Sequence, residues 1–154
     1  MLRTRNLIKH GVPKPVAKMA GGLENNAPIQ TRPIREFQGL VKKFPEFFPC
    51  SGKVVVFLSY GTTGGIVCCK KTGVFYEVVF EDGPGEYDEL GSYQEVLVDW
   101  FVRWWEGGER GPKLHERMEW LGFQFYELAA LEMESPKADS DERIRARIRE
   151  RRGT

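Results

Sequence analysis

Three extended apolar segments separated by glycine-containing turns constrain the fold of this chain more than any other feature. The first, residues 53–60 (KVVVFLSY), is almost entirely β-branched and aromatic, and glycines lie on both sides of it. Such a run predicts a strand with both faces largely buried. Two more strands are predicted over 66–70 and 74–81, because the turn 71–73 supplies a glycine. Together they predict an antiparallel meander over about residues 53–81.

Helical patterns flank these strands. Residues 34–44 carry apolar side chains at helical spacing and end before Pro45. The capping box Ser92-Tyr-Gln-Glu95 predicts a helix over about 92–106, and apolar spacing predicts another over about 112–134. We therefore expect an α+β fold, in which a small antiparallel sheet of three or more strands is packed by these two C-terminal helices.

The charges are divided unevenly along the chain. Residues 1–33 hold six basic side chains and one acidic, residues 34–134 hold 10 basic and 17 acidic, and residues 135–154 hold seven basic and four acidic. The prolines and glycines of the first segment, which break helices and strands, predict a basic arm that is mostly irregular. We expect one α+β domain over 34–134 and a charged helical tail over 135–154. Basic ends of this kind either bind nucleic acid or partners, or fold back on the acidic body.

The length of the chain, its apolar runs and its cysteines narrow the class of protein. With 154 residues the chain is about one domain long. It has no apolar run of the ~20 residues that cross a bilayer, and no secretory signal follows the basic N-terminus. Three cysteines, two of them adjacent, argue against a disulfide framework and fit a reducing compartment. We expect a cytoplasmic protein without membrane contact.

The stretch 61–73 (GTTGGIVCCKKTG) resembles a phosphate-binding loop at first sight. In such a loop a lysine follows the last glycine directly, whereas four strand-forming residues separate Gly65 from Lys70 here. The stretch is therefore interpreted as a hairpin, and no nucleotide cofactor is expected.

Neither the thiols nor the histidines suggest a catalytic or metal site. Cys68 and Cys69 are adjacent in a strand, so their side chains point to opposite faces and are expected to be small buried groups. Cys50 is the most exposed of the three by prediction. His115 is interpreted as a surface residue, and His10 is remote from it in sequence. We expect no metal, no cofactor and no enzymatic activity.

Charged and aromatic residues are the remaining candidates for binding. An acidic turn is interpreted as a solvated loop that faces a basic partner. Trp105 lies on a second apolar face of its helix, where it either packs on a neighbouring helix or binds a partner. In the basic tail, Arg145 and Arg149 are predicted to make contacts with a partner or with nucleic acid. The acidic residues of the turn are Glu81, Asp82, Glu86, Asp88 and Glu89.

Residues 57–105 resemble the C-terminal half of the SUKH (Smi/Knr-like) superfamily. The glycine-rich turn at Gly64-Gly65, the strand start at Gly73-Val74-Phe75-Tyr76 and the helix start at Ser92-Tyr93 occupy the places of that family's motifs. The N-terminal half departs from the pattern, and the helical region after residue 110 extends beyond it. The resemblance implies an α+β domain that binds proteins, often an immunity protein that neutralises a toxin, with no catalytic residues to carry over.

Two functions follow as expectations. The first is a non-enzymatic protein-binding module of SUKH-like type that inhibits a basic toxin such as a nuclease. The alternative is a structural subunit of a virion or nucleoprotein particle, in which residues 1–33 and 139–152 contact neighbouring subunits or nucleic acid.

Overall fold

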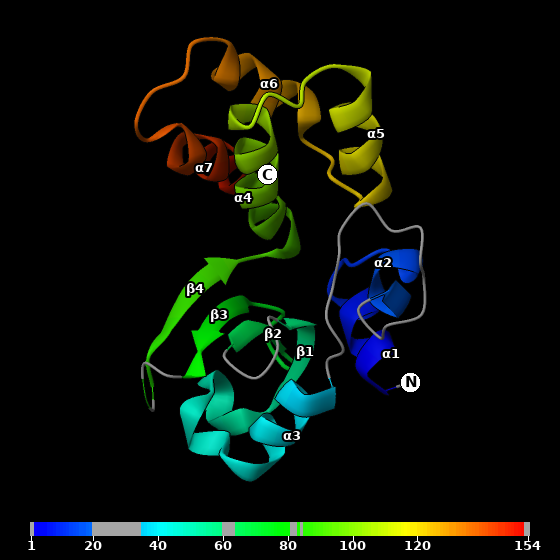
Figure 1. Ribbon diagram of the computed structural model, residues 1–154, viewed down its shortest axis with the longest axis vertical. Coiled ribbons are helices and arrows are strands. Elements are labelled where there is room, and N and C mark those ends of the chain that lie inside the picture. The colour runs from blue at the N-terminus through cyan, green and yellow to red at the C-terminus, as the bar shows by residue number, and fades with distance from the viewer. Residues whose placement is uncertain (1, 20–34, 60–63, 81–82, 84, 153–154) are drawn as a thin grey trace. The chain divides into compact units, whose positions relative to one another are not determined.

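A computed structural model describes residues 2–19, 35–59, 64–80, 83 and 85–152 of the chain. These residues form the expected α+β fold, with a four-stranded antiparallel sheet and helices before and after it (Figure 1). Contacts divide the chain into two compact units, residues 1–93 and 94–154. This division differs from the predicted arm, domain and tail, because both terminal segments contribute side chains to the core of a unit.

The first unit contains the sheet, whose strand order is β1-β2-β3-β4 with every neighbouring pair antiparallel. The three predicted strands are confirmed with small shifts at their ends. A fourth strand begins inside the segment predicted to be an acidic loop, residues 81–89, so that prediction is wrong for residues 87–89. The elements of this unit are α1 (Leu2–Lys9), α2 (Lys14–Met19), α3 (Arg35–Lys43), the 3-10 helices η1 (Pro45–Phe47) and η2 (Pro49–Gly52), β1 (Val54–Ser59), β2 (Gly64–Cys69), β3 (Phe75–Val79) and β4 (Tyr87–Gly91).

Both faces of β1 and β2 are buried, and β3 is partly buried. Side chains alternate along β3, so Phe75 and Val78 lie on opposite faces. On one face Phe75 packs with Phe57 and Tyr93, at centroid distances of 5.6 and 5.9 Å. On the other face Val78 joins a cluster with Phe37 of α3. The described helices that pack against β1 are α1 and α3, both N-terminal to it.

The N-terminal segment is more ordered than its sequence predicts. Residues 2–9 and 14–19 form α1 and α2, and Leu7 and Val16 are fully buried. The prediction of a mostly irregular arm is therefore wrong for residues 2–19, while its remainder, 20–33, lies outside the described residues. The breakers mark the end of α1: Gly11 has a φ of +98°, and the Val12 N–H donates to the carbonyl of Leu7 at 3.0 Å.

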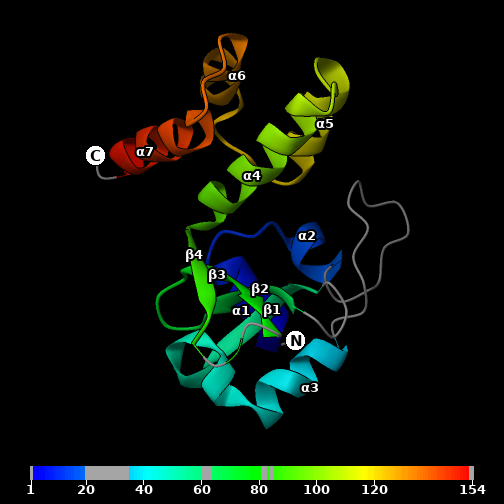
Figure 2. The same ribbon diagram turned by 60° about the vertical axis from the view of Figure 1, so that its left-hand side comes forward.

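The second unit is helical (Figure 2). Its first helix begins one residue after the predicted start at Ser92. The single helix predicted over 112–134 is wrong, since the chain forms two helices there. Its last helix confirms the predicted helical tail. The helices are α4 (Tyr93–Glu106), α5 (Pro112–Trp120), α6 (Tyr126–Glu134) and α7 (Ser140–Arg152).

Gly122 explains the break between α5 and α6. Its φ of +82° lies in the left-handed region that favours glycine. The Gly122 N–H donates to Glu119 O at 2.9 Å, and the Phe123 N–H donates to Met118 O at 2.8 Å. These two bonds form a Schellman motif, which satisfies the last carbonyl groups of α5 and ends the helix.

Candidate interaction surfaces

The glycine-rich stretch forms part of the sheet. Residues 64–69 are β2, a fully buried strand between β1 and β3, and the following turn leads into β3. A Cβ atom at Gly65 would collide with the carbonyl oxygen of Leu58 on the neighbouring strand, so a glycine is required by close approach of the two backbones. The hairpin interpretation is thus confirmed for residues 64–73, and residues 61–63 lie outside the described part.

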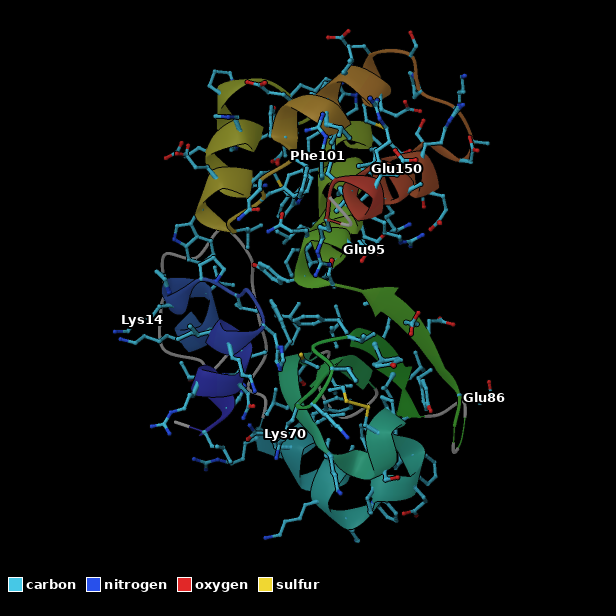
Figure 3. The ribbon with its side chains drawn as sticks, turned by 180° about the vertical axis from the view of Figure 1, so that it is seen from behind. Lys14, Lys70, Glu86, Glu95, Phe101 and Glu150 are labelled. Carbon is cyan, nitrogen blue, oxygen red and sulfur yellow. A yellow bond between two sulfur atoms is a disulfide. The ribbon has the colours of Figure 1, made fainter. Side chains whose placement is uncertain are left out.

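A disulfide joins Cys50 to Cys69, which corrects the expectation that the three cysteines argue against disulfide bonding (Figure 3). Cys50 lies in η2 with a φ of 59°, and this left-handed turn brings its Cα to 6.3 Å from that of Cys69 at the end of β2. The sequence could not reveal the pairing, because 19 residues separate the two cysteines and only tertiary packing brings them together. Cys50 is half-buried and not the exposed thiol that was predicted.

Cys68 is the free cysteine, and it is fully buried as predicted. Burial raises the pKa of its thiol to about 12, so it carries almost no thiolate at neutral pH. It therefore has the properties of a small core side chain.

The acidic residues predicted to face a partner lie on a sheet edge and in the turn that precedes it. Asp88 and Glu89 belong to β4 and are exposed, as is Glu86 just before it (Figure 3). Glu81 and Asp82 lie outside the described residues. Among the strands of the described residues, β4 is the last in the sheet and pairs with β3 alone. The sequence analysis missed this strand because Asp88, Glu89 and Gly91 have low strand propensity, and pairing with β3 compensates for this.

The pairing of β4 with β3 concentrates negative charge on both faces of the edge. Asp88 lies directly opposite Glu77, and Glu89 lies opposite Tyr76. Like charges directly opposite each other in a sheet are destabilising. Burial raises the pKa of Tyr76, and the Glu89 carboxylate, which accepts a hydrogen bond from this phenol, raises it further. Tyr87 adds an exposed ring, 5.5 Å from that of Tyr76.

The opposite edge of the sheet is covered. Arg3 of α1 donates from Nε to Val56 O at 2.6 Å and from Nη2 to Phe57 O at 3.2 Å, and so occupies two carbonyl groups of β1. Covering an edge in this way prevents another strand from adding to it. The two edges therefore differ, since α1 covers β1 whereas β4 presents exposed acidic side chains.

Trp105 packs within the helical unit. Its ring lies 5.6 Å from that of Phe101, and the Arg110 guanidinium lies over it at 5.0 Å. Its indole Nε1 is buried and has no hydrogen-bond partner among the described atoms. These contacts are with a residue of its own helix, α4, and with the segment that follows it, so packing on a neighbouring helix and binding a partner both stay predictions for Trp105.

The two predicted tail residues are engaged within their own unit. Arg145 of α7 is only 8 % exposed and pairs with Asp99 of α4, and it also donates to Glu142 at 2.7 Å. Burial lowers the pKa of Arg145, but the facing carboxylates outweigh this effect and leave it raised. Arg149 pairs with Glu95 at 2.5 Å. Part of the basic tail thus folds back on an acidic helix, one of the two alternatives that the charge distribution allowed.

The histidines have structural contacts. His10 Nε2 lies at hydrogen-bond distance, 2.8 Å, from Lys70 O, and the His115 ring meets Tyr126 edge-on at 4.5 Å. Within the part of the chain that the structure describes, no group of three or more His, Cys, Asp or Glu side chains is placed to bind a metal ion. None of the described helices combines the length and apolar character that crossing a bilayer requires.

Comparison with known proteins identifies no relative: no family model matches the sequence, and neither a curated protein nor a solved structure matches it.

Proposed function

We propose that this chain is a non-enzymatic protein-binding module whose β4 edge receives a basic segment of another protein. The observation that carries the proposal is the contrast between the two sheet edges. Arg3 occupies carbonyl groups of β1, while β4 pairs on one side only within the described part of the chain and exposes Tyr87, Asp88 and Glu89. An extended segment can add to such an edge through main-chain hydrogen bonds.

Charge defines the kind of partner. Asp88 and Glu89 point to opposite faces of β4, so Lys or Arg side chains at adjacent positions of an added strand would lie on opposite faces and each would meet a carboxylate. A second copy of the chain fits poorly, because two β4 strands side by side would bring their carboxylates together. The partner we favour is a basic toxin of the nuclease kind, whose cationic cleft suits an acidic inhibitor.

The test is charge reversal at the edge. The triple variant Glu86→Lys, Asp88→Lys, Glu89→Lys is expected to weaken binding about tenfold or more, because opposite charges accelerate association and fix the register. Native pull-down supplies the partner, and calorimetry with that purified partner measures the affinity. The matched control is Glu116→Lys, Glu134→Lys, Glu150→Lys, which changes three exposed carboxylates of the helical unit and alters the net charge equally. Equal affinities for the two triple variants would refute the proposal.

The alternative, a structural subunit held in a larger assembly, has its own observation. Arg5 and Lys9 on α1 and Lys14 on α2 remain exposed although other side chains of these two helices are buried. Figure 3 labels Lys14. Deleting the terminal segments would remove core residues such as Leu7, so charge reversal at the exposed cations is the cleaner test. A structural subunit would fail to assemble after Arg5→Glu, Lys9→Glu, Lys14→Glu, whereas binding at β4 would persist.

A further inference from the structure

The turn between α5 and α6 forms a cavity that the proposed function does not use. The cavity has a volume of about 340 Å³, and all of its walls belong to the helical unit. Phe123, Phe125 and Tyr126 line it together with His115 of α5. This volume is near the lower end of the ~300–1,000 Å³ that ligand pockets span, which suits a small ligand or a single side chain.

The aromatic rings around the cavity stand at steep angles to each other. His115 and Tyr126 have an interplanar angle of 85° at 4.5 Å between centroids, and Phe123 and Phe125 have an angle of 63° at 6.4 Å. Neither pair is stacked flat, and all four aromatic side chains line the same cavity. Aromatic side chains attract organic cations, because a ring face carries negative electrostatic potential.

The charged side chains around the cavity are mainly acidic. Glu119 of α5 and Glu127 of α6 line it and are exposed at its rim. Arg151 in the last turn of α7 also lines it. The cavity is thus lined by two carboxylates and one guanidinium. This charge favours the binding of a cationic ligand over that of an anionic one.

A clamp from α4 holds the turn that forms the cavity. Gln94 Nε2 donates to Gly122 O at 2.9 Å, while its Oε1 accepts from the Gln124 N–H at 3.0 Å. One side chain therefore fixes the backbone on both sides of Phe123. The walls are in place before any ligand arrives, which reduces the entropy cost of binding.

From these observations we infer that the cavity binds a methylated ammonium group, either in a free molecule such as choline or on a lysine side chain. A bare ammonium is strongly hydrated and loses that water when it moves against an aromatic ring. Methyl groups spread the charge over an apolar surface that matches the aromatic walls, and the carboxylates compensate the charge.

Calorimetric titration of the full chain with matched ligand pairs tests the inference. Choline is compared with its neutral isostere 3,3-dimethylbutanol, and N-acetyl-trimethyllysine amide with its unmethylated form. We expect the methylated cations to bind at least about threefold more tightly than their matched partners. Binding of choline but not the lysine derivative assigns the site to free cations, and the reverse assigns it to a modified side chain. Equal binding of charged and neutral isosteres, or no saturable binding of either cation, would overturn the inference.

Variants locate the binding in this cavity. Phe125→Leu and Glu127→Gln are each expected to weaken choline binding about three- to tenfold, whereas Arg151→Gln should strengthen it. Glu116→Gln is the matched control, since Glu116 is an exposed carboxylate of α5 outside the cavity wall. Circular dichroism verifies that each variant is folded. If Glu127→Gln and Glu116→Gln had the same effect, the site would lie elsewhere and the inference would fail.

Discussion

Arg3 joins three segments of the sheet unit through one side chain. Besides the two carbonyl groups of β1, its Nη1 donates to Ala17 O at 3.0 Å. Burial lowers the pKa of Arg3 to about 10, which still leaves the guanidinium charged at neutral pH. Only a planar fork with several donors can reach three carbonyl groups at once, so a lysine is not an equivalent replacement.

Replacing this fork should cost stability. Arg3→Lys is expected to lower the free energy of unfolding by about 1–3 kcal/mol, because carbonyl groups that now receive charged donors would lose them. Urea unfolding measures the change. Arg5→Lys is the control, since Arg5 lies exposed on the same helix, and its effect should stay within about 0.5 kcal/mol. Similar losses for the two variants would show that the Arg3 contacts contribute nothing.

At the scale of elements, α7 is held by a small apolar seam and by ion pairs. Ile144 and Ile148 are fully buried, and Arg145 and Arg149 pair with Asp99 and Glu95 of α4. A helix this charged would be marginal in isolation. Its stability therefore depends on the buried isoleucines and on partners that satisfy its arginines.

Arg145→Met should loosen this attachment. We expect a loss of about 1–3 kcal/mol in the free energy of unfolding, since Asp99 would keep a partly buried charge without this partner. Arg147→Met on the exposed side of α7 should change little. In a double-mutant cycle, Asp99→Asn should cost less when Arg145 is already replaced. Strictly additive losses would mean that the two side chains do not stabilise each other.

At the scale of the whole molecule, the chain has two compact units with different stabilising features. The disulfide Cys50–Cys69 lies in the first unit, and the α4–α7 ion pairs lie in the second. A disulfide that closes a loop of this length stabilises a folded unit by about 3 kcal/mol through the unfolded state. Each unit can therefore be perturbed separately.

Calorimetry of the full chain should show two unfolding transitions. Reduction is expected to lower the free energy of unfolding of the sheet unit alone, by about 3 kcal/mol, and so to shift only its transition to lower temperature. Arg145→Met is expected to shift only the transition of the helical unit. Cys50→Ala supplies the control, because its transitions should no longer respond to reductant. Unfolded without reductant, the chain should expose one reactive thiol, that of Cys68. A single transition shifted by both changes, or three reactive thiols, would contradict this description.

The sequence alone determined the elements whose signals are local. β-branched runs and turn glycines located β1, β2 and β3, and apolar spacing located α3, α4 and α7, because strand and helix formation there agrees with the chemistry of adjacent residues. One local signal was overlooked: Gly122, after Trp120 and Leu121, is typical of the residue that follows the end of a helix, and it divides the segment 112–134 into two helices.

Tertiary structure decided what depends on residues far apart in the chain. β4 forms because it pairs with β3 through backbone hydrogen bonds. Cys50 bonds to Cys69, which lies 19 residues further along the chain, and Arg3 donates to β1, which lies more than fifty residues further along. The acidic edge and the aromatic cavity are likewise products of pairing and packing. Local propensity determines the conformation of a segment, but which surfaces meet and which stay open follows from the free energy of burying distant residues together.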